Sequence, residues 1–206
     1  ILLFDMDDLR IEPELARTEI IDGIRTQGLS EHSVEAYYRR TLRTFEESDC
    51  GCASTEELAT AMRRRTFSCF VIPNGFDESI LSRARLAVRR RRLETRHGLT
   101  RMGYAAGTRT HQRDFGRIVG PVASILQERP DCRLVLFRDA ATGVPLLDPA
   151  EFPALRGLED RIEWRNSVEH EDLADEIARF DINVAPLEVG NRFCEGKSEL
   201  KFVQAA

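Results

Sequence analysis

The chain has 206 residues, of which 42% are hydrophobic, and its formal net charge at pH 7 is −5. The hydrophobic content suffices for a packed core, whereas the acidic balance excludes a general nucleic-acid binder, which needs a strongly basic face. No apolar stretch approaches the roughly 20 residues that cross a bilayer. We therefore expect a globular protein.

The few cysteines and lysines limit which kinds of site the chain can contain. The five cysteines are odd in number, and Cys50-Gly51-Cys52 is too tightly spaced for a zinc knuckle. We predict no disulfide framework and no metal site, and we expect a cytoplasmic location. Only Lys197 and Lys201 among the 30 basic residues are lysines, which suggests that a compact ammonium is needed there.

Strand and helix patterns alternate from the start of the chain. Residues 1–4 predict a buried strand. Pro13 and Gly28 bound a predicted helix at 13–27, and Ser30 is a good N-cap for a second one at 30–48. Further predicted elements are a strand at 50–53, a helix at 58–64 capped by 54–57, and a strand at 67–72 that ends in the turn 73–75.

The alternation continues to the end of the chain. The predicted elements are helices at 78–97, 114–128 and 169–180, strands at 102–106, 133–137, 161–164 and 182–186, and a final helix from about residue 196. Strands separated by helices of about ten to fifteen residues are typical of βαβ units. The predicted fold class is α/β, with parallel sheets of Rossmann-like type. We interpret the arginine run 89–92 as part of a solvated helix.

Ligands of open parallel sheets bind beyond the carboxyl ends of the strands. One such end carries Gly107, Arg109 and Arg113, which predict a phosphate-binding loop although they match neither the Walker pattern nor G-x-G-x-x-G. The same loop also holds residues that are equally well interpreted as helix caps or plain loop residues: Thr108, Thr110 and His111.

A second strand end is the segment 186–201. It places five residues at the start of the predicted last helix: Glu195, Gly196, Lys197, Ser198 and Glu199. Acidic residues there are also ordinary caps, but the mixture with lysines suits a ligand that has both phosphates and hydroxyls. Ser198, Lys201 and Gln204 follow a three-residue step and are expected to share one helix face.

The third strand end is the acidic run at residues 5–8. Asp5 and Asp7 resemble the opening motif of haloacid-dehalogenase-like phosphatases, in which the first Asp is a nucleophile and the second a general acid. That chemistry needs a later lysine followed by an acidic pair for magnesium, and the two lysines lie too near the chain end for such a pair. The run also fits the metal-binding DxD of GT-A glycosyltransferases, or acids that cap a loop.

Four segments, in this order and spacing, resemble the GT-B glycosyltransferases of family 4. They are residues 72–77 (IPNGFD), residues 103–109, residues 133–137 and residues 193–206, the last with the Lys-Ser-Glu-Leu-Lys stretch of one subgroup. Residues 5–9 and 52–59 resemble the late part of the acceptor-side domain in that subgroup. The likeness covers nearly the whole chain.

The resemblance implies a domain order. Residues 1–72 would be the late part of the N-terminal, acceptor-side domain, residues 73–77 the interdomain crossover, and residues 78–206 a truncated C-terminal donor-binding domain. The chain begins at Ile1 without an initiator Met and stops within a helical pattern. We therefore expect a fragment of a longer protein, without turnover on its own.

The implied activity is transfer of a sugar from a nucleotide-sugar donor to a carbohydrate or lipid-linked acceptor, with retention of configuration and without metal or cofactor. The full-length protein could associate peripherally with a membrane. Glu195 and Glu199 are the candidates for a catalytic acid, and Gln204 stands where the family commonly has a second Glu. The residues implied in binding the donor diphosphate and sugar are Gly107, Arg109, Arg113, Gly196, Lys197, Ser198, Glu199, Lys201 and Gln204.

Two alternatives remain open from the sequence. One is the phosphatase that uses Asp5 and Asp7. The other is a non-catalytic interaction module, which Gln204 and the arginine run 89–92 suggest.

Overall fold

A computed structural model of the chain describes residues 1–65, 68–75, 77–93 and 98–205, except for the side chains of residues 203 and 205. The chain divides into two compact units, which we describe separately. The first consists of Ile1–Gly75 and Leu187–Leu200, and the second of Phe76–Pro186 and Lys201–Ala206. The predicted domains instead group residues 187–200 with 78–206, and that assignment stays a prediction.

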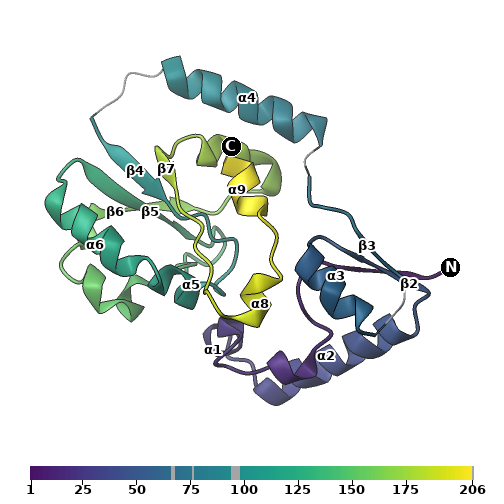
Figure 1. Cartoon of the computed structure of the whole chain (residues 1–206). Coiled ribbons are helices and arrows are strands. Elements are labelled where there is room, and N and C mark those ends of the chain that lie inside the picture. Colours follow the sequence, from purple (N-terminus) through teal and green to yellow (C-terminus); the bar gives the residue numbers. More distant parts are fainter. Residues whose placement is uncertain (66–67, 76, 94–97, 206) are drawn as a thin grey trace. The chain divides into compact units, whose positions relative to one another are not determined.

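The first unit is built on a three-stranded parallel sheet with the order β1-β2-β3 (Figure 1). Its elements are β1 (Leu3–Met6), η1 (Pro13–Leu15), α1 (Asp22–Thr26), α2 (Glu31–Glu46), β2 (Cys50–Ala53), α3 (Glu56–Arg63), β3 (Cys69–Val71) and α8 (Arg192–Glu195). Two of these helices start at the predicted caps. The Ser30 and Thr55 hydroxyls accept hydrogen bonds from the amides of Ser33 (3.1 Å) and Leu58 (3.2 Å).

The predicted single helix at 13–27 is wrong. The segment forms the short 3₁₀ helix η1 and then α1, because backbone groups between them bond elsewhere. The Thr18 amide donates to the Glu31 carboxylate (2.7 Å), and the Ile20 carbonyl accepts from the Asn191 amide (2.7 Å). Gly28 does end α1, with a φ of 65° that favours glycine.

Helices cover one face of this sheet. Paired residues of parallel strands point to the same side, and Phe4, Gly51 and Cys69 are paired across β1, β2 and β3. Phe4 packs against Phe45 of α2 (ring centroids 5.3 Å apart), and the Cys69 sulfur lies 3.6 Å from that of Met62 in α3.

On the opposite face two apolar side chains are largely exposed, Leu3 (59%) and Phe70 (60%), although Cys52 between the edge strands is buried. The prediction of a buried strand at residues 1–4 is therefore wrong. The strand spans Leu3–Met6, and no helix of the described first unit packs on that side of Leu3.

The second unit contains a four-stranded parallel sheet with the order β6-β5-β4-β7. Its elements are α4 (Glu78–Leu93), β4 (Thr100–Gly103), α5 (Gln112–Gly116), α6 (Val119–Glu128), β5 (Cys132–Arg138), η2 (Pro149–Glu151), η3 (Pro153–Leu155), η4 (Glu159–Arg161), β6 (Ile162–Asn166), η5 (His170–Asp172), α7 (Leu173–Ile177), β7 (Ile182–Asn183) and most of α9 (Leu200–Ala205). The predicted α/β class with parallel sheets is confirmed.

The helix predicted at 114–128 is divided into α5 and α6. Pro121 has no amide hydrogen and cannot lie inside a continuous helix without losing a bond to residue 117. The chain therefore restarts at Val119, which places Pro121 in the first turn of α6. The helix predicted at 169–180 likewise consists of the shorter η5 and α7.

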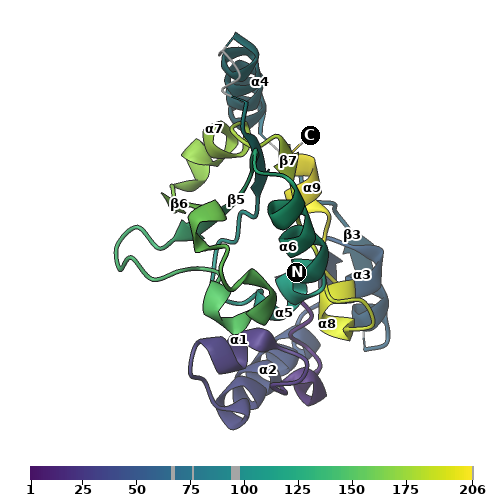
Figure 2. The ribbon, with the colours of Figure 1, turned by 90° about the vertical axis from the view of Figure 1, so that its left-hand side faces the viewer.

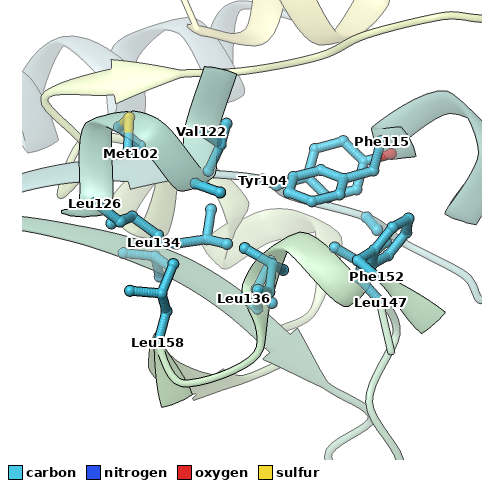
Figure 3. Packing of buried hydrophobic residues seen from close by; sticks show 14 of the residues in the cluster. Met102, Tyr104, Phe115, Val122, Leu126, Leu134, Leu136, Leu147, Phe152 and Leu158 are labelled. Atoms are coloured by element: carbon cyan, nitrogen blue, oxygen red, sulfur yellow. The ribbon is translucent and has the colours of Figure 1, made fainter. Parts of the chain in front are cut away.

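The core of this unit covers both faces of its central strand. Leu134 and Leu136 of β5 are completely buried and lie among Leu126, Leu147 and Leu158, and the rings of Tyr104 and Phe115 lie next to each other, 5.1 Å apart (Figure 3). The other face of the same strand is also covered, because Phe137 packs against Phe180 (6.1 Å).

The arginine-rich helix α4 lies beside α7 (Figure 2). The Arg83 guanidinium forms ion pairs with Asp172 and Asp175, and the Arg91 guanidinium forms one with Asp181 (3.3 Å). These pairs agree with a solvated helix that packs on its own unit. Residues 94–97, the end of the predicted helix, lie outside the described residues. No helix in the described part of the chain is both long and apolar enough to cross a membrane.

The final helix was predicted to begin near residue 196, and this prediction is wrong. Gly196 follows the short α8, and α9 begins at Leu200. The Gly196 carbonyl accepts a hydrogen bond from the Thr55 hydroxyl (3.0 Å), and a Cβ at this position would lie 2.9 Å from Leu58. These contacts hold residues 196–199 in a non-helical connection.

Candidate functional site

The strand order of the second unit defines a place for a ligand. From β4 the chain passes to β5 and β6 on one side, and then returns to β7 on the other side of β4. The strand order thus reverses between β4 and β7. Open parallel sheets bind ligands beyond the carboxyl ends of the strands at such a switch point. Residues 104–111 follow β4 at this point.

Arg109 of this loop is engaged by acidic side chains. Its guanidinium lies 3.0 Å from Asp148 and 3.7 Å from Glu151, and all three side chains are about one third exposed or less. An anionic ligand of Arg109 would therefore compete with two carboxylates. Gly107 is exposed, and a Cβ added to it would have no described atom within 4 Å. No contact in the described part of the chain therefore requires glycine at this position.

Gln112 fixes the geometry of the Asp148 segment. This side chain is 1% exposed, donates to the Leu146 carbonyl (3.0 Å) and accepts from the Asp148 amide (3.0 Å). Both the nitrogen and the oxygen of the side-chain amide form hydrogen bonds. They hold the segment that contains Asp148, which pairs with Arg109, against α5. Arg113 lies on the same short helix and is half-buried.

Lys201 of α9 is brought to the end of β4. Its ammonium lies 5.5 Å from the centroid of the Tyr104 ring, a distance that allows a cation–π contact. Tyr104 is 1% exposed and directly follows β4. A cation of the predicted site is thus held at the switch point. Gln204 lies one turn further along α9 and is half-buried.

The other predicted lysine has a different environment. Lys197, in the first unit, lies 3.5 Å from Asp8 and 5.1 Å from the centroid of Phe193. Burial alone would raise the pKa of Asp8, but Lys197 and the hydrogen bond from Arg10 outweigh it, so the pKa lies below its ordinary value. Lys197 is therefore partly neutralised.

The remaining predicted residues of this segment also belong to the first unit. The Ser198 hydroxyl accepts from the Asn74 amide (2.8 Å). Glu195 lines a cavity of about 400 Å³ together with Glu56, Arg64 and Arg192. Glu199 is exposed.

Buried polar groups anchor this segment. Asn191 caps α8, accepting from the Phe193 amide (3.0 Å), and donates to Glu188 (2.9 Å). Arg192 forms an ion pair with Glu12, which is 5% exposed. Burial raises the pKa of Glu12, and Arg192 offsets this effect only in part.

The acidic run lies at the carboxyl end of β1. Asp5 and Asp7 are exposed and line an open cavity of about 560 Å³ with Tyr37 and Arg40 of α2. Within the described residues, no group of three or more His, Cys, Asp or Glu side chains is placed to hold a metal ion. The five cysteines are all free thiols.

The predicted site residues therefore belong to two groups. Gly107, Arg109, Arg113, Lys201 and Gln204 are in the second unit, whereas residues 195–199 are in the first. The sequence analysis missed Tyr104, Gln112 and Asp148, which position these groups. None of the three had been predicted as a site residue, and Tyr104 lies in the middle of the strand predicted at 102–106.

No protein-family model matches the chain, and no curated protein matches it. Solved structures do. WaaG, a glycosyltransferase involved in lipopolysaccharide biosynthesis, has 14% identity and a TM-score of 0.62 over 100% of this chain and 54% of its own.

Two further solved structures match most of the chain. HepE of Anabaena, solved in complex with UDP and glucose, has 17% identity, a TM-score of 0.51 and coverage of 88% of this chain and 45% of its own. Sucrose-phosphate synthase of Thermosynechococcus elongatus has 15% identity, a TM-score of 0.52 and coverage of 91% and 46%. The chain thus spans about half the length of these proteins and shares their α/β fold with parallel sheets, as the resemblance to GT-B enzymes predicts.

Proposed function

We propose that this chain is part of a glycosyltransferase that transfers a sugar from a nucleotide-sugar donor to a carbohydrate or lipid-linked acceptor. The observation that carries the proposal is the switch point between β4 and β7, where Lys201 lies against Tyr104 at the end of β4. The fold shared with WaaG, HepE and sucrose-phosphate synthase supports sugar transfer as the type of reaction.

In the proposed reaction, the bond between the anomeric carbon and the donor's diphosphate oxygen breaks, and a bond to an acceptor hydroxyl oxygen forms as that hydroxyl loses its proton. Negative charge develops on the departing diphosphate, and fixed cations stabilise such charge. Lys201 and Arg113 are the residues proposed to do so. Arg109 contributes less, because Asp148 and Glu151 neutralise it. Retention of configuration, independence of metal and a cytoplasmic location complete the proposal.

Calorimetric titration of the chain with UDP, GDP and dTDP tests the proposal. We expect one of them to bind, and Lys201→Ala to raise its Kd about tenfold or more, because a hydrogen bond to a charged group contributes about 1.5–3 kcal/mol. The matched control is Arg156→Ala, since Arg156 is an exposed cation of the same unit that follows η3.

Two results would contradict the proposal in different ways. Absence of binding by all three nucleotides would contradict the function itself. Binding that Lys201→Ala and Arg156→Ala affect equally would contradict the site at the switch point.

A further inference from the structure

His111 lies in the loop 104–111 that follows β4, but it is not among the residues predicted to bind the donor. It directly precedes α5, and its Nδ1 atom lies 2.8 Å from the Asp114 carboxylate. The two side chains are only 15% and 7% exposed, respectively. A carboxylate at Nδ1 fixes the orientation of an imidazole. The ring is thus held with Nε2 on the side away from Asp114.

The backbone of His111 is held at the end of β4. The Tyr104 hydroxyl donates to the His111 carbonyl (3.4 Å), and the Phe115 amide donates to the same oxygen (3.1 Å). The same Tyr104 ring carries the Lys201 ammonium on it. The backbone of His111 and the ammonium of Lys201 are therefore both in contact with one buried tyrosine at the switch point.

We propose that His111, oriented by Asp114, binds the diphosphate of the nucleotide beside Lys201, by donating a hydrogen bond from Nε2 to a phosphate oxygen. The inference rests on the proposed function. A phosphate oxygen is the fitting partner because the Lys201 ammonium and an Nε2–H group are both donors, and hydrogen bonds between charged donors and phosphate are about twice as strong as neutral ones. In this arrangement His111 contributes a directed hydrogen bond to the phosphate, and Lys201 contributes a positive charge.

A pair of substitutions separates this role from a structural one. In His111→Asn the amide nitrogen can replace Nδ1 and keep the bond to Asp114, whereas the group at Nε2 is lost. In His111→Gln the amide nitrogen reaches the position of Nε2 instead. We expect His111→Asn to raise the Kd for UDP about tenfold or more, and His111→Gln to stay within about threefold of the unsubstituted chain. If UDP does not bind, the same titration uses whichever of GDP and dTDP does.

The matched control is His170→Asn, since His170 is an exposed histidine of the same unit that follows the edge strand β6. Its Kd should be unchanged, and thermal unfolding checks that each variant is folded. A structural role predicts the opposite order, in which His111→Asn binds normally and His111→Gln is destabilised. That order, or normal binding by both variants while Lys201→Ala loses the ligand, would overturn the inference and leave the proposed function standing. Absence of binding by any nucleotide would overturn both.

Discussion

The two parallel sheets differ in how their faces are covered. In the second unit, β5 has completely buried side chains on both faces, for example Val135 and Leu136. In the first unit, one face of the sheet packs on α2 and α3, while Leu3 and Phe70 on the other face remain more than half exposed. Parallel sheets normally bury both faces. Both units have a buried apolar cluster, but only the second sheet has buried apolar side chains on both faces of one strand.

The largest test of this difference compares Leu136→Ala with Phe70→Ala. Leu136 is 0% exposed, and its truncation should lower the free energy of unfolding by about 3 kcal/mol, since it leaves a cavity. Phe70 is 60% exposed, and its truncation should cost less than about 0.5 kcal/mol. Denaturant unfolding reports the former through Trp164, the only tryptophan, which is paired with Leu136 across β5 and β6. Hydrogen exchange of β3 peptides reports the latter.

Equal losses in the two variants would refute the comparison. A large loss for Phe70→Ala would mean that its face of the first sheet is covered after all. A small loss for Leu136→Ala would mean that the second core tolerates a cavity.

Two glycines make a second and smaller test. A Cβ on Gly103 of β4 would lie 2.2 Å from the Phe180 ring, which also packs against Phe137. A Cβ on Gly51 of β2 would lie 2.4 Å from the terminal methyl of Met62, the far end of a flexible side chain. We expect Gly103→Ala to cost about 2 kcal/mol and Gly51→Ala about 1 kcal/mol or less, because the whole Phe180 ring would have to move, whereas rotation of the terminal methyl of Met62 is enough.

Thermal and denaturant unfolding of the two glycine variants measure this difference. The opposite order would show that the first sheet is the more rigidly packed of the two.

Local sequence signals predicted most of the fold correctly. Ser30 and Thr55 start helices, and the strand at 50–53 has the predicted bounds, because capping hydroxyls and turn residues act over a few positions. Two of the errors occurred where distant groups compete for the backbone, whereas the helix predicted at 114–128 is divided at Pro121, which is a local signal. The Asn191 side chain donates a hydrogen bond to the Ile20 carbonyl, and the Thr55 hydroxyl donates one to the Gly196 carbonyl. The sequence around residues 20 and 196 does not predict these partners.

The site was predictable only as a set of strand ends. Gly107, Arg109 and Arg113 were placed at the end of β4 from their order alone, because carboxyl ends of parallel strands share an edge. The acids that hold Arg109 could not be predicted, since Asp148 and Glu151 lie at the start and end of the short η2, about 40 residues later. Nor could the sequence show that Lys197 and Lys201, four positions apart, contact Asp8 and Tyr104 respectively.

The smallest expected effect concerns Asp8, whose ion pair with Lys197 helps to hold residues 187–200 on the first unit. The pKa of Asp8 is lower in the folded chain than its ordinary 3.8, so its ionised form stabilises the fold above pH 3.8, and this contribution disappears as the pH falls through the folded pKa. Asp8→Asn should therefore cost about 1 kcal/mol at pH 7, and this cost should shrink as the pH falls through the folded pKa.

Hydrogen exchange of a peptide covering residues 187–200 measures this local loss. The control is Glu163→Gln, because Arg165 and Arg101 likewise outweigh burial and lower the pKa of Glu163, but in the second unit. That substitution should leave exchange in residues 187–200 unchanged. If Asp8→Asn also left exchange in residues 187–200 unchanged at pH 7, the ion pair with Lys197 would not be what holds this segment on the first unit.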